Sequence, residues 1–268
     1  MPRPAGLSVV LDGRLPRSRM LQLAGFAPRL GLAGIWWRQP PYLGECPQDV
    51  TSLLDDLQQA GAGARVGVIA EVGAGRADRI SNPALPPAVP AIIVGSPRDL
   101  AAWRRNNAGN QAISLLAVTG SPATVGAGPR TGAFLPVRTD RNLEAELAAV
   151  ARRISGRQLF VEVCVSVGRT TAEAAARADR DVLFHYLGHP SEQGLFGTLE
   201  HCQQAAAALS RAGVTELICH VPLAVDLPDV LAQLCAVNAV GPDILRPDGL
   251  PSPAPAPPAG WGGRRRQA

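Results

Sequence analysis

The chain of 268 residues contains no lysine, so all of its 26 basic residues are arginines. Against 22 acidic residues they give a formal net charge of +4 and a pI near 9.1. A basic balance can indicate nucleic-acid binding. Exclusive use of arginine beside 28 glycines and 25 prolines is more typical of a GC-rich coding sequence than of selection for phosphate contacts. The composition therefore predicts no nucleic-acid partner.

Cysteine is scarce as well, and long hydrophobic runs are missing. Five scattered cysteines, an odd number without a C-x-x-C pair, exclude a disulfide framework and predict a reduced, cytoplasmic protein. No apolar run approaches the roughly 18 residues of a membrane span. The run LSVVL before Asp12 is too short for a signal peptide. We expect a soluble protein without a membrane partner.

The sequence does carry a recurring order of helix, glycine and strand. Glycine suits the left-handed position that often ends a helix. The strands that follow are almost continuously apolar, which is typical of parallel strands covered on both faces. The pattern recurs in LGLAGIWW (30–37), AGARVGVIAEV (62–72), SGRQLFVEVCVSV (155–167) and AGVTELICHV (212–221). It predicts an α/β fold.

Alternation of this kind fits either an open doubly wound sheet or a (β/α)8 TIM barrel, and eight strands in about 240 residues favour the barrel. The barrel is expected over 1–241, and a Pro/Arg-rich disordered tail over 242–268. Strands are expected at 7–12, 34–38, 65–72, 91–94, 112–118, 133–137, 159–167 and 216–222, and helices at 16–32, 50–61, 97–106, 142–154, 171–187, 199–212 and 228–238.

The stretch IIVGSPRDLAAW (92–103) runs from a strand into a helix and is a candidate anion site. A helix N-terminus offers free amides to a phosphate, Gly95 permits close approach, and Ser96 and Arg98 add donors. The alternative is that Ser96 only caps its own helix.

Aromatic and histidine side chains also stand at expected strand ends, where barrel enzymes carry their chemistry. Alternation sends one of Trp36 and Trp37 toward the interior or mouth and the other toward the helices. His220, in ELICHVP, is a candidate to face the mouth, although a core histidine is an alternative. His185 and His189 lack the glutamate of a zinc motif, so no metal site is predicted.

Taken in order, these pieces resemble the luciferase-like flavin-dependent oxidoreductases, which use FMN or the deazaflavin F420. The likeness covers most of the first 240 residues. It is carried by the stretches 16–41 (PRSRMLQLAGFAPRLGLAGIWWRQPP), 49–72, 89–116 (VPAIIVGSPRDLAAWRRNNAGNQAISLL), 160–179 and 196–222 (FGTLEHCQQAAAALSRAGVTELICHVP).

The resemblance implies a (β/α)8 barrel, usually a homodimer, with FMN or F420 at the C-terminal mouth. It places the cofactor phosphate at Gly95, Ser96 and Arg98, and the bulge behind the ring at Ala70, Glu71 and Val72. Reduced cofactor would transfer hydride to a small organic substrate or combine with oxygen to oxygenate one. Trp37 and His220 are the candidate catalytic residues of the pocket.

The chain also departs from the family pattern. The glycine-rich fourth-strand segment is not found between Val72 and Pro90, which predicts a shortened barrel or lid. The second strand ends in Trp-Trp-Arg-Gln, where acid and histidine residues often stand in relatives. A degenerate, non-catalytic barrel that serves as a binding or scaffolding subunit is therefore the alternative.

Overall fold

The structure, a computed structural model, describes the chain in segments, within which the helices and strands below are formed. The segments are residues 5–38, 50–72, 90–106, 113–118, 133–135, 147, 149–150, 152, 158–187, 191, 194–222 and 227–238. The expected tail, the segment before Pro90 and most of the expected helix at 142–154 lie outside them.

Nine strands form one sheet, and all the pairings between them are parallel. The strands are β1 (Gly6–Asp12), β2 (Gly34–Arg38), β3 (Arg65–Val72), β4 (Ala91–Gly95), β5 (Ile113–Val118), β6 (Ala133–Leu135), β7 (Leu159–Gly168), β8 (Gly194–Thr198) and β9 (Glu216–His220).

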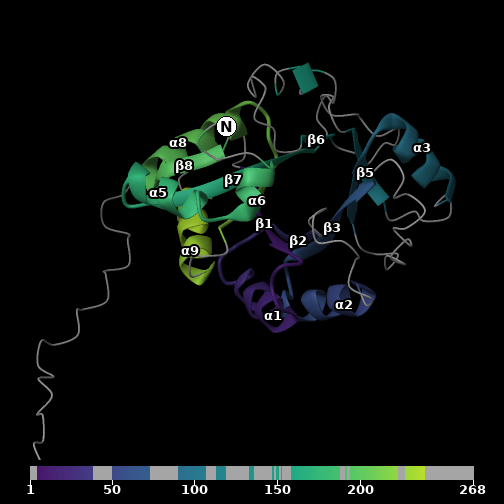
Figure 1. Cartoon of the computed structure of the whole chain (residues 1–268), viewed down its shortest axis with the longest axis horizontal. Coiled ribbons are helices and arrows are strands. Elements are labelled where there is room, and N and C mark those ends of the chain that lie inside the picture. The colour runs from purple at the N-terminus through teal and green to yellow at the C-terminus, as the bar shows by residue number, and fades with distance from the viewer. Residues whose placement is uncertain are drawn as a thin grey trace, which may run out of the picture.

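The strands are arranged in a curved sheet that bends round as in a barrel (Figure 1). It runs β5-β4-β3-β2-β1-β9-β7-β6, with β8 paired to the last part of β7. The first strand thus pairs with the last, and the two ends of the order, β5 and β6, lie close together. No ladder joins β5 to β6 within the described segments. The predicted α/β fold is confirmed, and the strands curve round as in a barrel whose sheet is not closed between β5 and β6 in the described segments.

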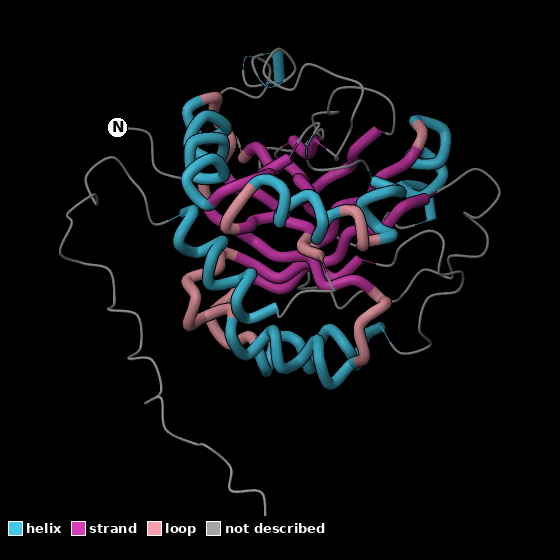
Figure 2. Tube along the Cα trace, turned by 60° about the vertical axis from the view of Figure 1, so that its left-hand side comes forward, coloured by secondary structure: helices cyan, strands magenta, loops and turns pink. Residues whose placement is uncertain are grey.

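The helices surround the strands (Figure 2). They are α1 (Arg17–Phe26), α2 (Val50–Ala60), α3 (Pro97–Asn106), α5 (Thr171–Ala178), α6 (Val182–Leu187), α8 (Leu199–Arg211) and α9 (Leu227–Asn238). The helix ends follow the local signals. The Thr170 hydroxyl accepts from the Glu173 amide at 3.2 Å, as a threonine does in a capping box of the form Thr-x-x-Glu. Gly213 ends α8 with φ +98, a conformation that favours glycine.

Two elements differ from the prediction. The single helix expected over 171–187 is broken into α5 and α6, because the Asp181 carboxylate accepts from the Leu183 amide at 2.8 Å and starts a new helix. Strand β8 was not predicted at all. It is five residues long and contains Gly194 and Gly197, so it lacks the apolar run that marks the other strands.

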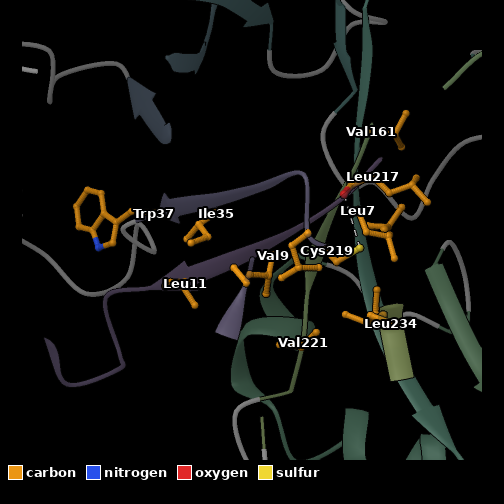
Figure 3. Close-up of a cluster of buried hydrophobic side chains, with 14 of the residues drawn as sticks. Leu7, Val9, Leu11, Ile35, Trp37, Val161, Leu217, Cys219, Val221 and Leu234 are labelled. Atoms are coloured by element: carbon orange, nitrogen blue, oxygen red, sulfur yellow. Dashed lines mark hydrogen bonds between the residues drawn. The ribbon is translucent and has the colours of Figure 1, made fainter. Parts of the chain in front are cut away.

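Alternation along the strands separates two layers of the core. One side chain in two packs outward against the helices, as Leu7, Val9 and Leu11 of β1 do in the large outer cluster (Figure 3). The others point into the barrel. The apolar side chains of this inner cluster are Val10, Trp36, Ile69, Ile92, Val94, Phe134, Phe160 and Ile218.

Candidate active site

A charged cluster lies within the barrel, formed by Arg38 of β2, Glu162 of β7 and His220 of β9. All three residues are at most 3% exposed. One oxygen of Glu162, Oε1, accepts from the guanidinium of Arg38 and lies 2.6 Å from Nε2 of His220. Nη1 of Arg38 is 3.4 Å from the same Nε2. We call these three residues the interior triad.

The strand pattern accounts for this meeting. Glu162 is two residues beyond Phe160 on β7 and shares its inward face, and β7 and β9 pair so that Cys164 lies opposite His220. A carboxylate in such a place is stable only when paired, because an unpaired buried charge costs several kcal/mol. Arg38 supplies the opposite charge. Geometry also assigns the histidine tautomer: Glu162 Oε1 can only accept when ionised, so Nε2 carries the hydrogen.

A second polar group closes the N-terminal end of the barrel. The Glu216 carboxylate accepts from the Ser8 hydroxyl at 2.5 Å, from the Trp36 indole at 3.1 Å and from the guanidinium of Arg65. Arg65 also lies over the rings of Trp36 and Phe160, with its Cζ 5.5 and 5.4 Å from the ring centres. This end of the barrel is thereby occupied by polar side chains that are paired with one another.

At the C-terminal mouth, Arg14 bridges two carboxylates. Its guanidinium donates to Asp12, at the end of β1, at 2.7 and 2.9 Å, and to Asp181, before α6, at 2.9 Å. Burial alone would lower the pKa of Arg14, but the hydrogen bonds and charges of Asp12 and Asp181 outweigh it and raise that pKa above its ordinary value. Arg14 therefore stays charged.

The strand ends that the resemblance assigns to the cofactor lie side by side at the same mouth. β3 and β4 pair so that Val72 is opposite Gly95 and Ala70 is opposite Ile93. Ala70 is partly exposed; the side chains of Glu71 and Val72 are outside the description. Ser96 follows at the first turn of α3, where its carbonyl accepts from the amide of Leu100 at 2.9 Å.

The remaining predicted residues are distributed differently. Ser96 is partly exposed and Arg98 is exposed. His220 is buried and points into the barrel, where its contact with Glu162 matches the core-histidine alternative, and its catalytic role remains a prediction. Trp37 lies in the outer cluster, at the helix side of β2 (Figure 3), and Trp36 is the tryptophan that faces inward. The catalytic role of Trp37 remains a prediction, and its position favours packing.

Sequence reasoning missed Arg38 and Glu162 as partners. Glu162 had a usable signal, since it is the one charged residue within the apolar run FVEVCVSV of β7. Arg38 directly follows the two tryptophans in the sequence, and nothing in that position indicates a buried partner. The pairing itself joins residues 124 positions apart, which no local pattern reveals.

Cys164 points to the same interior but is not a ready nucleophile. Burial, with the charge of Glu162, raises the pKa of its thiol well above the ordinary value, so it stays protonated at neutral pH. Within the described segments no group of three or more His, Cys, Asp or Glu side chains could hold a metal ion. No helix among them is long and apolar enough to cross a membrane.

Comparison with solved structures identifies the fold. The structure titled apo-MsnO8 aligns with a TM-score of 0.50 and 16% identity, over 87% of this chain and 98% of that one. The fold is shared with MsnO8. An F420-dependent secondary alcohol dehydrogenase in complex with an F420-acetone adduct aligns at TM-score 0.47 and 14% identity, over 87% and 98% of the two chains. The F420-dependent tetrahydromethanopterin reductase of Methanopyrus kandleri gives 0.48 and 11%, over 87% and 97%.

No protein-family model matches the sequence, and no curated protein does. The likeness to MsnO8, at 16% identity, shows the fold alone.

Proposed function

We propose that this protein is a luciferase-like oxidoreductase that binds FMN or F420 at the C-terminal mouth of the barrel. The observation that carries the proposal is the pairing of β3 with β4, in which Val72 is opposite Gly95. It brings together the two stretches that the sequence resemblance assigns to the ring and to the phosphate, although they are separated by more than 20 residues of chain. The shared fold with MsnO8 supports it.

The residues at this corner suit an anionic, flat ligand. The first turn of α3 offers amides that a phosphate can accept from, and Arg98 adds an exposed guanidinium in that turn. The side chain of Ala70 packs against the outer cluster, so in this proposal the backbone of Ala70 to Val72, and not the Ala70 methyl group, would support the ring. Ser96 is partly exposed and stands between the two.

The cofactor, when bound, would supply hydride transfer to a small organic substrate or the activation of oxygen. The chain's own residues would hold the phosphate at Gly95, Ser96 and Arg98, support the ring at Ala70 to Val72, and exclude water. The interior triad would form the polar bottom of the site below the mouth, and His220 would contribute an imidazole to it. We include a homodimer in this proposal, as in the family that the sequence resembles.

Titration tests the proposal directly. The purified protein is added to FMN and, separately, to F420, and ligand fluorescence is followed. We expect saturable binding of one of them with a Kd below about 1 mM, equivalent to about 4 kcal/mol. If neither binds in this range, the enzyme proposal is wrong and the scaffolding alternative gains.

A matched pair of variants tests the phosphate position. Arg98→Ala removes a charge-assisted hydrogen bond worth about 1.5 to 3 kcal/mol and should weaken binding about tenfold or more. Arg105→Ala removes an equally exposed arginine from the last turn of the same helix and should leave the Kd unchanged. Equal effects of the two variants would show that Arg98 acts only through the overall charge of α3.

A further inference from the structure

The helices α5 and α6 cover the inner face of the last part of β7. Phe184 of α6 and Ala178 of α5 form a buried cluster with Cys164, and all three are fully buried. Two residues beyond Cys164, the Ser166 hydroxyl donates to the Ala174 carbonyl at 2.7 Å. Glu162, Cys164 and Ser166 are two residues apart along β7 and therefore share one face of the strand, the face that points into the barrel.

The opposite face of β7 is already occupied. Val163, Val165 and Val167 belong to the outer cluster, together with Cys202 of α8. In a barrel, the helix that follows a strand usually packs on this outer side. Here α8 takes that side, and α5 and α6 turn over the mouth. We call the segment Thr171–Leu187 the cap.

One ion pair ties the cap to the end of β1, two strands away from β7 in the sheet. Arg14, held by Asp12 at the end of β1, donates to Asp181 in the corner between α5 and α6. The side chains of Arg14 and Asp181 are only 17% and 2% exposed, so water screens this pair weakly. Figure 1 shows α6 lying beside β7 and β1, where this contact is made.

Besides this pair, Arg177 of α5 donates to the carbonyl of Val167 on β7, and His185 of α6 contacts the carbonyl of Asp179 within the cap. Within α6, Leu183 and Phe184 are buried, whereas Val182 is 59% exposed and His185 is exposed. A helix of six residues is too short to be stable by itself, and short segments at the edge of a fold can open locally at a small part of the global free energy. Opening of α6 would uncover Cys164 and, below it, the interior triad.

We propose that the cap is a gate over the C-terminal mouth, latched by the Arg14–Asp181 ion pair, and that it opens to admit the ligand of the barrel. The identity of that ligand rests on the proposed function; the gate itself does not. Asp181 accepts from Arg14 and also accepts from the Leu183 amide, by which it caps α6. Opening therefore loosens the latch and the first turn of the helix together.

Alkylation of cysteines measures the gate without any ligand. Cys164 lies under Phe184, while Cys219 is equally buried on the neighbouring strand β9 but belongs to the outer cluster. Native protein is treated with N-ethylmaleimide, and the modification of each cysteine is followed by peptide mass spectrometry. Opening of the gate exposes Cys164 alone, whereas global unfolding exposes both.

Two variants weaken the latch. Asp181→Asn keeps an oxygen that can cap α6 but removes the charge, and Arg14→Ala removes the bridge from both carboxylates. We expect each to speed alkylation of Cys164 at least tenfold, with the Cys219 rate unchanged. Arg17→Ala is the control, since it breaks an Arg–Asp pair of 2.5 Å between α1 and α2, away from the cap. It should change neither rate.

The outcomes separate the two proposals. If the Cys164 rate stays as in the wild type in both latch variants, or rises only together with the Cys219 rate, the gate is wrong. Stopped-flow mixing with FMN and F420 then asks whether the gate serves the cofactor: faster association in Asp181→Asn supports this. Absence of binding by the wild type overturns the proposed function, while the alkylation result still decides the gate.

Discussion

At the scale of single residues, Glu162 matters most, because it is a carboxylate at 3% exposure whose Oε1 meets both Arg38 and His220. Glu162→Leu should lower the free energy of unfolding by about 3 to 5 kcal/mol, since Arg38 is left as a buried, uncompensated charge. Urea denaturation measures this.

The double variant Arg38→Met, Glu162→Leu checks the cause. It replaces the pair by apolar side chains of similar size and should recover much of the loss. A double variant no more stable than Glu162→Leu would show that packing, and not the unpaired charge, explains the single substitution. Arg17→Ala, which breaks an exposed pair, should cost at most about 1 kcal/mol.

At the scale of an element, the N-terminus of α5 carries a glutamate, Glu173, whose charge depends on pH. The hydrogen bond from the Arg169 amide, followed by the charge of Arg177, lowers the pKa of Glu173. A carboxylate with a lowered pKa in the folded state stabilises the protein above its unfolded pKa, and this stabilisation disappears as the pH falls through the folded value.

Glu173→Gln isolates that charge, because the amide still offers an oxygen to the Arg169 amide. The wild type should melt at a higher temperature than Glu173→Gln at neutral pH, and the difference should vanish in acid, below the folded pKa. Thermal melts followed by circular dichroism at several pH values measure it. A difference that persists unchanged into acid would exclude the carboxylate charge as its source.

At the scale of the whole molecule, the barrel depends on contacts between the two ends of the chain. β1 pairs with β9, and α9 buries Val230, Leu234 and Val237 in the outer cluster that β1 shares. Each such side chain contributes about 1.5 to 3 kcal/mol, so together they approach the 5 to 15 kcal/mol that a domain typically has in total.

A chain that ends at Pro222 should therefore be largely unfolded, while a chain that ends at Asn238 should keep the wild-type melting temperature. Calorimetry of the two truncations tests this. Loss of cooperative melting in the chain that ends at Asn238 would mean that residues beyond Asn238 contribute to the barrel, against the prediction of a disordered tail over 242–268.

The sequence determined the local features by itself: the strands and their buried character, most helix ends, the Thr170 cap and the glycine at position 213. Each depends on residues within a few positions of one another, where propensity and periodicity act. It failed at β8, where two glycines hide a short strand, and at Asp181, where a side chain splits one expected helix into two.

Only the tertiary structure decided which polar residues meet. The interior triad, the Glu216 group and the Arg14–Asp181 latch join residues 58 to 208 positions apart, and their pairing follows from strand register and from the path of α5 and α6. The same holds for Trp36 and Trp37: alternation predicted that one faces inward, but which one depends on the curvature of the barrel, a property of the whole sheet.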